Sequence, residues 1–323
     1  MADGITRSKK TMQARAFKCL LDSLGRMRFL AGTDLAALLE ANAEKILNLP
    51  GKMPFFATRT TSLETLKNFV NTLHPVSCDR ELVRLGPDGD GGYLVPNDLA
   101  AIEACFSPGV SDVAGFELDC AEMGMKVFMA DASVEQAPAA HPRFSFLRRF
   151  IGAETQDDFI SLEEWVNQSV GQSRSDLLLQ MDIEGFEYET LLATPSALLE
   201  RFRIMVIEFH VLDYLLSEPI FSIYRQVFAR ILRTHVCVHI HPNNLCRPLK
   251  VGSLDWLQMA EFTFLRRDRV SNPTFATRFP HALDRDNSKN RKTFPLPELY
   301  YRSLQGDDQL ARKVSISSGS ASL

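Results

Sequence analysis

The 323-residue chain lacks the features that mark secreted, fibrous and membrane proteins. Its six cysteines are scattered with no Cys-x-x-Cys pair, which excludes a disulfide framework and a cysteine-based zinc site. No apolar run reaches the roughly 18 residues that a membrane-spanning helix needs. Lys18 and Asp22 flank the only short apolar cluster near the N-terminus, so a signal peptide is not expected. These absences predict a cytoplasmic protein with reduced thiols, and the basic N-terminus leaves organelle targeting as the alternative.

The chain also lacks a large excess of either charge, because its net charge is only −4. A chain without an overall positive field is not expected to bind nucleic acid. Basic residues gather in two flanks: residues 1–31 contain seven Lys or Arg against two Asp, and residues 266–292 contain eight against three. The flanks are either solvated segments or a landing surface for an anionic substrate, membrane or partner.

The pattern along the chain divides it into three segments. Residues 1–80 are expected to be a helical extension, with helical spacing over Asp34–Leu47 and a capping box at Thr61 and Glu64. This extension is a candidate lid or homo-oligomer contact. Residues 81–270 alternate short apolar runs with helical patterns, which predicts an α/β domain with a mostly parallel sheet. Residues 271–323 are rich in Asn, Ser, Pro and charge, which predicts a loosely ordered polar tail.

Seven apolar runs of the middle segment are the candidate strands. The last two runs are joined by a loop and not by a long helix, which favours a closing antiparallel hairpin after five βα units. This order resembles the Rossmann-like sheet of class I S-adenosylmethionine-dependent methyltransferases, whose last strand is antiparallel. Six of the runs end near Ser107, Asp131, Phe150, Asp182, His210 and His241, and the seventh starts at Glu261.

Polar residues follow these strands where an open parallel sheet binds its ligand, at the carboxyl ends. Ser107, Pro108 and Gly109 form a small-residue turn that lets a ligand approach the backbone. Asp131, after the next strand, is suited to accept hydrogen bonds from ribose hydroxyls. The phosphate-binding pattern Gly-x-Gly-x-x-Gly is absent, which favours an adenosyl ligand without phosphates over a dinucleotide, although an ordinary βα connection gives the same pattern.

Acidic and imidazole side chains concentrate at two further strand ends. Asp182 follows one strand, and Glu208 and His210 share a face at the end of the next because they are two residues apart. His239 and His241 repeat this spacing on the following strand. We expect these groups to meet in one crevice, since burying several ionisable groups together is costly unless the site uses them.

The segment Asp88–Pro96 contains too many glycines for a helix or strand interior and predicts a special turn leading into a helix. Asp88 and Asp90 also resemble the Asp-x-Asp pair with which some glycosyltransferases hold a divalent metal. A metal-dependent glycosyltransferase is therefore one alternative function. A non-catalytic module that retains the fold and acts through its extension or basic flanks is another.

Several motifs, in the right order between about Leu82 and Asp268, resemble the FkbM-type family of S-adenosylmethionine-dependent O-methyltransferases. They are RLGPDGDGGYLVP, CFSPGVSDVAGFE, KVFMADAS, SDLLLQMDIEGFEYETLL, RIMVIEFH, HIHPNN and EFTFLRRD. The resemblance implies methyl transfer to a hydroxyl of a sugar, glycan or other small molecule. It further implies that Ser107–Gly109 lines the methionine part of the cofactor, that Asp131 holds the ribose and that residues 150–152 lie near the adenine. The full expected cofactor-binding set is Asp90, Gly91, Ser107, Pro108, Gly109, Glu117, Asp131, Ile151 and Asp182.

Methyl transfer to an alcohol needs a group that removes or acidifies the hydroxyl proton. His210 is the first candidate base, with Glu208 orienting its ring, and Asp182 is the second. A divalent Mg, Mn or Zn ion is the alternative, held by Asp182, Glu208 and His210 with His239 as a further ligand.

Overall fold

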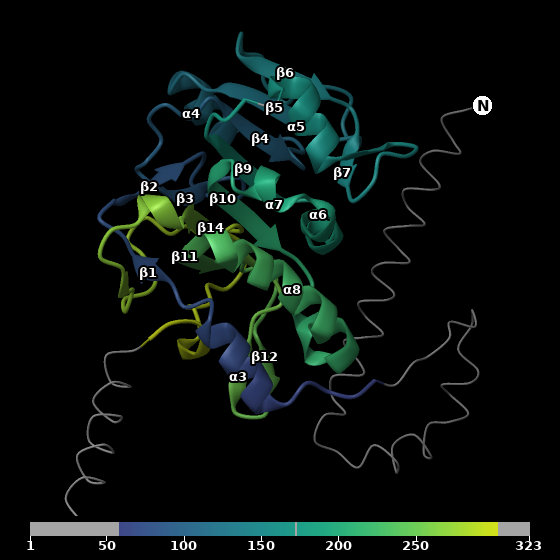
Figure 1. Ribbon diagram of the computed structural model, residues 1–323. Helices are drawn as coiled ribbons and strands as arrows, with labels where there is room; N and C mark the ends of the chain where they lie inside the picture. The colour runs from purple at the N-terminus through teal and green to yellow at the C-terminus, as the bar shows by residue number, and fades with distance from the viewer. Residues whose placement is uncertain (1–57, 172, 303–323) are drawn as a thin grey trace, which may run out of the picture. The chain divides into compact units, whose positions relative to one another are not determined.

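The computed structural model describes residues 58–171 and 173–302 (Figure 1). The helix expected over Asp34–Leu47, the basic residues 1–31 and the end of the tail, residues 303–323, lie outside this described part. All described residues except Val251–Ser253 belong to one compact unit. Within the described part, no helix combines the length and the apolar content needed to cross a membrane.

The main sheet has seven strands. Strand β14 (Ala260–Arg266) is the last of the seven along the chain, and it lies between two strands that come earlier in the chain (Figure 1). Four neighbouring pairs are parallel, whereas β14 runs antiparallel to both of its neighbours. The mostly parallel α/β sheet and the closing hairpin expected from the sequence are therefore confirmed. The order across the sheet is β11 (His235–Pro242), β14 (Ala260–Arg266), β10 (Phe202–Phe209), β9 (Leu177–Met181), β4 (Ala104–Pro108), β5 (Lys126–Ala130) and β6 (Phe144–Leu147).

Five α-helices lie in the connections of this sheet, but they do not make five βα units. Residues 131–143, between β5 and β6, contain no helix, and Pro138 and Pro142 there cannot sit inside one. The helices of the connections are α4 (Gly115–Glu122), α5 (Leu162–Val170), α6 (Glu187–Ala193), α7 (Ser196–Leu199) and α8 (Glu218–Thr234). The smaller elements are α3 (Leu63–Asn71), β1 (Val76–Ser77), β2 (Leu82–Leu85), β3 (Tyr93–Pro96), β7 (Phe150–Gly152), β8 (Phe159–Ser161), η2 (Leu212–Leu216), β12 (Leu249–Val251), β13 (Leu254–Trp256), η3 (Arg267–Arg269), β15 (Thr274–Phe275) and η4 (Glu298–Tyr300).

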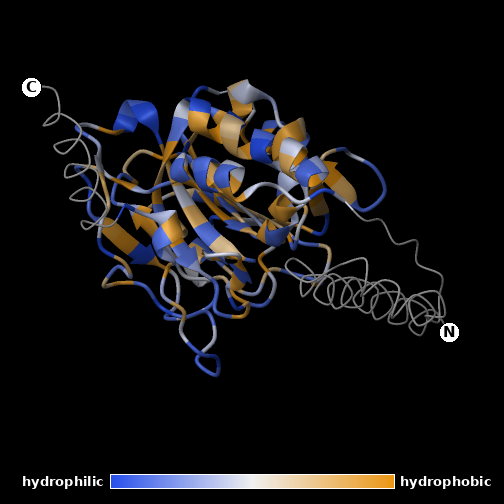
Figure 2. Ribbon diagram, turned by 90° about the horizontal axis from the view of Figure 1, so that it is seen from below, coloured by the Kyte–Doolittle hydropathy of each residue, from blue (hydrophilic) through white to orange (hydrophobic). Residues whose placement is uncertain are grey.

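Both faces of the sheet are covered, which is why its strands are continuous apolar runs. On one face, strand residues such as Cys105, Val127 and Val206 form a buried cluster with residues of α4 and of the β2–β3 hairpin. On the other face, Phe228 of α8 packs its ring on Phe209 and Phe262. The helices carry hydrophobic residues on part of their surface and hydrophilic residues on the rest (Figure 2).

Local signals placed most element ends within a few residues. Ser161 caps α5, its Oγ accepting a hydrogen bond from the Glu164 backbone N–H at 3.2 Å. The predicted cap of α3 is wrong by one residue, because Ser62 Oγ accepts from the Thr65 N–H while the Thr61 hydroxyl donates to the Leu215 carbonyl. The expected third strand ends at Leu147, so residues 150–152 form β7 in a separate small sheet with β8.

Two further segments differ from the expectation. The glycine-rich turn within Asp88–Pro96 leads into strand β3 and not into a helix, because residues 82–85 and 93–96 pair as an antiparallel hairpin. Residues 271–302 have the polar composition of a loosely ordered tail, yet here they pack on the sheet. Polar contacts hold this segment: His239 bonds to Asp284, Asn287 to Glu261, and Ser288 to Asn244. Such contacts leave no apolar pattern that a sequence reading can detect.

Candidate functional site at the carboxyl edge of the sheet

One face of the sheet changes from apolar to polar toward the carboxyl ends of its parallel strands. Alternate residues of a strand point to the same face, so in β10 the series runs from Val206 through Glu208 to His210. In β9 the corresponding series ends in Gln180 and Asp182. The same face that is packed by α4 and the hairpin therefore carries the ionisable groups at its edge.

His210 lies at the centre of these groups. Its Nε2 atom is 3.8 Å from Asp182 Oδ1, 3.6 Å from Glu184 Oε2 and 4.0 Å from Glu208 Oε1. Its Nδ1 atom is 3.1 Å from Glu187 Oε1. The structure thus brings the three predicted catalytic residues together. We call the group of Asp182, Glu184, Glu187, Glu208 and His210 the His210 cluster.

Glu187 orients the imidazole, a role that the sequence analysis gave to Glu208. Glu187 is fully buried at the start of α6, and its Oε1 atom also accepts the backbone N–H groups of Ile183 and Gly185, both at 3.1 Å. Glu208 instead accepts a hydrogen bond from Asn243 Nδ2 at 2.7 Å. Glu187 lies at the start of α6, so its closeness to His210 does not follow from spacing along strand β10.

The protonation states of the cluster depart from those of free side chains. Burial opposes charge on His210, but the hydrogen bond and charge of Glu187, followed by the charges of Asp182 and Glu208, raise its pKa to about 10. Burial, together with the carboxylates of Glu184 and Glu187, raises the pKa of Asp182 to about 7. Burial likewise raises the pKa of Glu208 well above its ordinary value, with Asp182 and Glu261 adding to the shift. Near neutral pH, His210 is therefore protonated and Asp182 is the group poised to exchange a proton.

Buried carboxylate oxygens of the cluster lack hydrogen bonds within the described residues. They are Oδ1 of Asp182, Oε2 of Glu187 and Oε2 of Glu208. An unpaired buried polar atom is costly, so such atoms point to a ligand, a water or an ion as the missing partner.

The turn after β4 touches the ends of both neighbouring strands. The Gly109 N–H donates to the Ala130 carbonyl at 2.9 Å, and the Asp182 N–H donates to the Pro108 carbonyl at 3.3 Å. Gly109 has a φ of +87°, and a Cβ atom there would lie 1.6 Å from the Asp182 carbonyl oxygen. Only glycine allows this approach, which draws the Ser107–Gly109 turn against the His210 cluster.

Ser107 and Glu117 meet beneath this turn. Ser107 Oγ lies 2.5 Å from Glu117 Oε1 and 2.7 Å from Gln180 Oε1. Burial raises the pKa of Glu117 to about 7, so the carboxyl can share a proton with the hydroxyl at neutral pH. The Ser107 side chain is fully buried, so what it offers is support for the turn.

Asp131 stands at the end of β5 beside the same turn. Its Oδ2 atom accepts the backbone N–H of Ser111 at 3.0 Å, and its Oδ1 atom accepts that of Ser133 at 2.7 Å. These bonds fix the carboxylate while leaving each oxygen a lone pair for another donor. The position predicted for a ribose-binding acid thus exists in the fold.

The remaining candidates lie around this edge. The turn of the β2–β3 hairpin packs on the start of α4, since a Cβ on Gly91 would lie 3.2 Å from a Val113 methyl carbon. Asp90 accepts a hydrogen bond from Asn287 Nδ2 at 3.3 Å. Ile151 is buried in β7, outside the main sheet.

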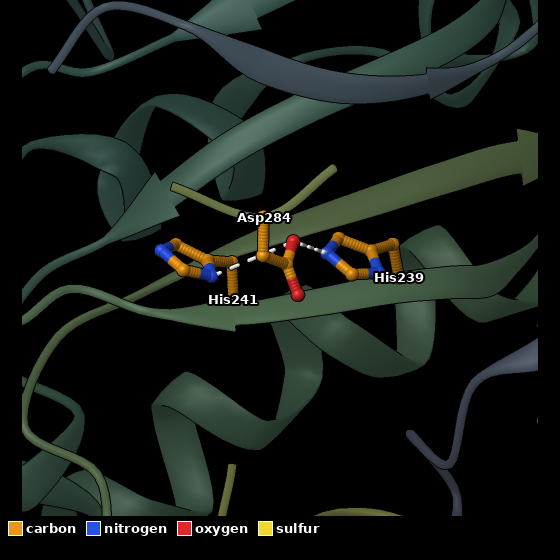
Figure 3. A group of neighbouring side chains, drawn as sticks. All are labelled: His239, His241 and Asp284. Carbon is orange, nitrogen blue, oxygen red and sulfur yellow. Dashed lines mark hydrogen bonds and ion pairs between the residues drawn. The ribbon is translucent and has the colours of Figure 1, made fainter. Parts of the chain in front are cut away.

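His239 belongs to a different group from His210, so it is not the further ligand expected for an ion held by Asp182, Glu208 and His210. Strand β14 lies between β10 and β11, and two strand spacings of about 4.8 Å separate their side chains. Among the described residues, Asp182, Glu184 and His210 can share one ion, with donor atoms within 4.8 Å of one another. His239, His241 and Asp284 form a second such group, the His239 cluster (Figure 3).

Asp88 and Asp90 interact with protein side chains. Asp88 Oδ1 lies 3.4 Å from Arg285 Nε and 3.9 Å from Arg84 Nε, and its side chain is 72% exposed. Neither aspartate belongs to a metal-competent group of the described residues. This arrangement gives no support to a metal site of the glycosyltransferase type.

Comparisons with known proteins leave the function to be argued from this geometry. No model of a protein family matches the chain, and no curated protein matches it either.

Proposed function

We propose that this protein is an S-adenosylmethionine-dependent O-methyltransferase of the FkbM type that acts on a hydroxyl of a sugar, glycan or other small molecule. The observation that carries the proposal is the seven-stranded sheet with antiparallel β14 between β10 and β11, with acids gathered at its carboxyl edge. This is the strand arrangement expected for a class I methyltransferase. The motif resemblance between Leu82 and Asp268 supports the same function.

The chain's residues fit the cofactor at one side of that edge. Ser107, Pro108 and Gly109 would line its methionine part, because the glycine removes any side chain from the turn. Asp131 would accept the ribose hydroxyls with the lone pairs that its backbone bonds leave. Asp90, Gly91, Glu117 and Ile151 are the further candidates around these residues. When bound, S-adenosylmethionine supplies a methyl group on a positively charged sulfur.

The His210 cluster would handle the acceptor on the other side of the turn. Positioning the acceptor oxygen supplies much of the rate of an in-line displacement. The acceptor proton would pass to Asp182 Oδ1, whose carboxyl has a pKa near 7 and lacks a hydrogen-bond partner. His210, held protonated by Glu187, would donate to the acceptor or stabilise the ionised Asp182. This assignment reverses the order of the two bases expected from the sequence.

A divalent ion is the second way to activate the hydroxyl. Asp182, Glu184 and His210 would be its ligands, with Glu208 beside them. Such an ion would lower the pKa of the acceptor hydroxyl. Chelation separates the two versions: turnover that survives removal of divalent metals supports the Asp182 base, and turnover restored only by added metal supports the ion.

Calorimetric titration with S-adenosylhomocysteine tests the proposed function. We expect the unaltered chain to bind it and Asp131→Asn to bind at least about tenfold more weakly, since a hydrogen bond to a charged group contributes roughly 1.5–3 kcal/mol. Asp112→Asn is the matched control, because Asp112 is exposed in the same turn region. Binding of a nucleotide sugar without any binding of S-adenosylhomocysteine would instead establish the glycosyltransferase alternative. Cofactor binding without turnover on any hydroxyl acceptor would favour the non-catalytic module.

A further inference from the structure

The His239 cluster joins strand β11 to a segment more than forty residues later in the chain. His239 and His241 are alternate residues of β11, so both side chains point to the same face of the sheet. Asp284 comes from the segment that follows β15 and lies between the two rings (Figure 3). The cluster is therefore a contact between two parts of the fold that share no backbone pairing at this point.

The donor atoms of the cluster are spaced as ligands of one small ion. Asp284 Oδ1 lies 2.8 Å from His239 Nε2 and 3.6 Å from His241 Nδ1. All three atoms lie within 4.8 Å of one another. Around a tetrahedral zinc ion with bonds of about 2.0–2.1 Å, neighbouring ligand atoms are about 3.3 Å apart. The two measured distances lie on either side of that value, so small side-chain movements would accommodate the ion.

His241 lacks the partners that a buried imidazole normally has. The residue is 8% exposed, and neither of its ring nitrogens has a hydrogen-bond partner among the described residues. Buried polar side chains are almost always hydrogen-bonded, and leaving one unpaired costs free energy. An ion that accepts the Nδ1 lone pair would give one of these two nitrogens a partner.

We propose that His239 Nε2, His241 Nδ1 and Asp284 Oδ1 bind a zinc ion separate from the His210 cluster. Two imidazole nitrogens and one carboxylate favour zinc over magnesium or calcium, which prefer all-oxygen sites. Asp284 also accepts the His281 N–H at 2.7 Å, which orients its carboxylate. A water would complete four-coordination.

The zinc ion clips the segment around Asp284 onto the sheet. Asn287, three residues further on, donates to Glu261 at 2.7 Å and to Asp90 at 3.3 Å. The segment thereby reaches the hairpin turn beside the proposed cofactor site. Because metal binding free energy adds to folding free energy, we expect this clip to stabilise the whole edge. The zinc site does not depend on the proposed methyl transfer.

Metal content and cobalt spectroscopy of the full chain test the site. The chain purified without chelator should contain one equivalent of zinc. After zinc is removed, added Co²⁺ should give the intense visible absorption of a tetrahedral ion. His241→Gln and Asp284→Asn should each weaken Co²⁺ binding at least about a hundredfold, since even partners outside the ligand set are worth 10–100-fold. His210→Gln is the control that alters the other group and should leave the absorption intact.

Three results would overturn the inference: no retained zinc together with no cobalt absorption, absorption that survives both His241→Gln and Asp284→Asn, or absorption lost in His210→Gln alone. If either ligand variant fails to fold, thermal denaturation of the unaltered chain replaces it. Zinc added to the metal-free chain should then raise the midpoint, and an unchanged midpoint would contradict the clip.

Discussion

Two clusters of carboxylates and imidazoles lie on the same edge of the sheet, yet they are built for different chemistry. The His210 cluster has one imidazole among four carboxylates, and the Glu184 side chain is 83% exposed. The His239 cluster has two imidazoles and one carboxylate, all with side chains at most 10% exposed. An excess of acids in a partly open site raises carboxyl pKa values toward neutrality, which suits proton transfer. An excess of imidazoles in a closed site suits a structural metal.

The largest expected effect is a loss of turnover, which should follow from changing the His210 cluster. Asp182→Asn should lower turnover by about 10²–10⁴-fold, the usual contribution of a general base. Release of S-adenosylhomocysteine with a working hydroxyl acceptor measures this effect. Glu189→Gln, an exposed acid on the same helix as Glu187, should leave the rate unchanged. A rate for Asp182→Asn close to that of the unaltered chain would remove Asp182 from the mechanism.

The close backbone approach at Gly109 lies beside the His210 cluster. Gly109→Ala should destabilise the fold by about 3–5 kcal/mol, since overpacking and left-handed strain add. Gly124→Ala is a matched control, because its φ is +95° but a Cβ there would meet nothing within 4 Å. That variant should lose only about 1–2 kcal/mol from strain. Urea denaturation measures both, and equal losses would show that the contact with Asp182 does not matter.

The two clusters should respond to pH with opposite sign. The folded pKa of Asp182 is raised to about 7, so its contribution to stability is present below its unfolded value and is lost as pH rises through about 7. Burial opposes charge on Asp284, but its hydrogen bond to His239 and the nearby His241 ring lower its folded pKa, so its contribution is lost as pH falls through the acid range. In metal-free protein, Asp182→Asn should flatten the stability curve between about pH 4 and 7, and Asp284→Asn should flatten it below about pH 4. The same change from both variants would contradict the assignment.

A smaller effect tests the partner of His210. Glu187→Gln keeps an oxygen for the Ile183 and Gly185 N–H groups but removes the negative charge beside Nδ1. The pKa of His210 should fall from about 10 by at least about one unit. Imidazole NMR titration measures it, with Glu189→Gln as the control. An unchanged value would return the orienting role to Glu208.

The smallest effect is expected at the Asp-x-Asp pair. Asp88→Asn should change neither turnover nor metal content, because its exposed side chain forms weak ion pairs with Arg84 and Arg285 at 3.4–3.9 Å. Metal analysis and a rate measurement on the same sample check this prediction. Loss of bound metal in Asp88→Asn would support the glycosyltransferase alternative.

The sequence predicted the strands and their polar ends because a buried parallel strand is a continuous apolar run that stops at the edge. Asp131, Asp182 and His210 were found in this way. Apolar runs do not give the order of strands across a sheet, so the residue pattern by itself did not separate His239 from His210. Asp284 was missed for the same reason, since its contact with His239 joins residues far apart in the sequence. Glu187 lies within the motif SDLLLQMDIEGFEYETLL, but only the fold shows that its carboxylate reaches His210.

A crystal structure with S-adenosylhomocysteine tests the central claim most directly. We predict that the ligand lies over Ser107–Gly109, with its ribose hydroxyls on Asp131 and its sulfur facing the His210 cluster. A ligand bound elsewhere, or no bound ligand at concentrations that saturate methyltransferases, would contradict the proposed function.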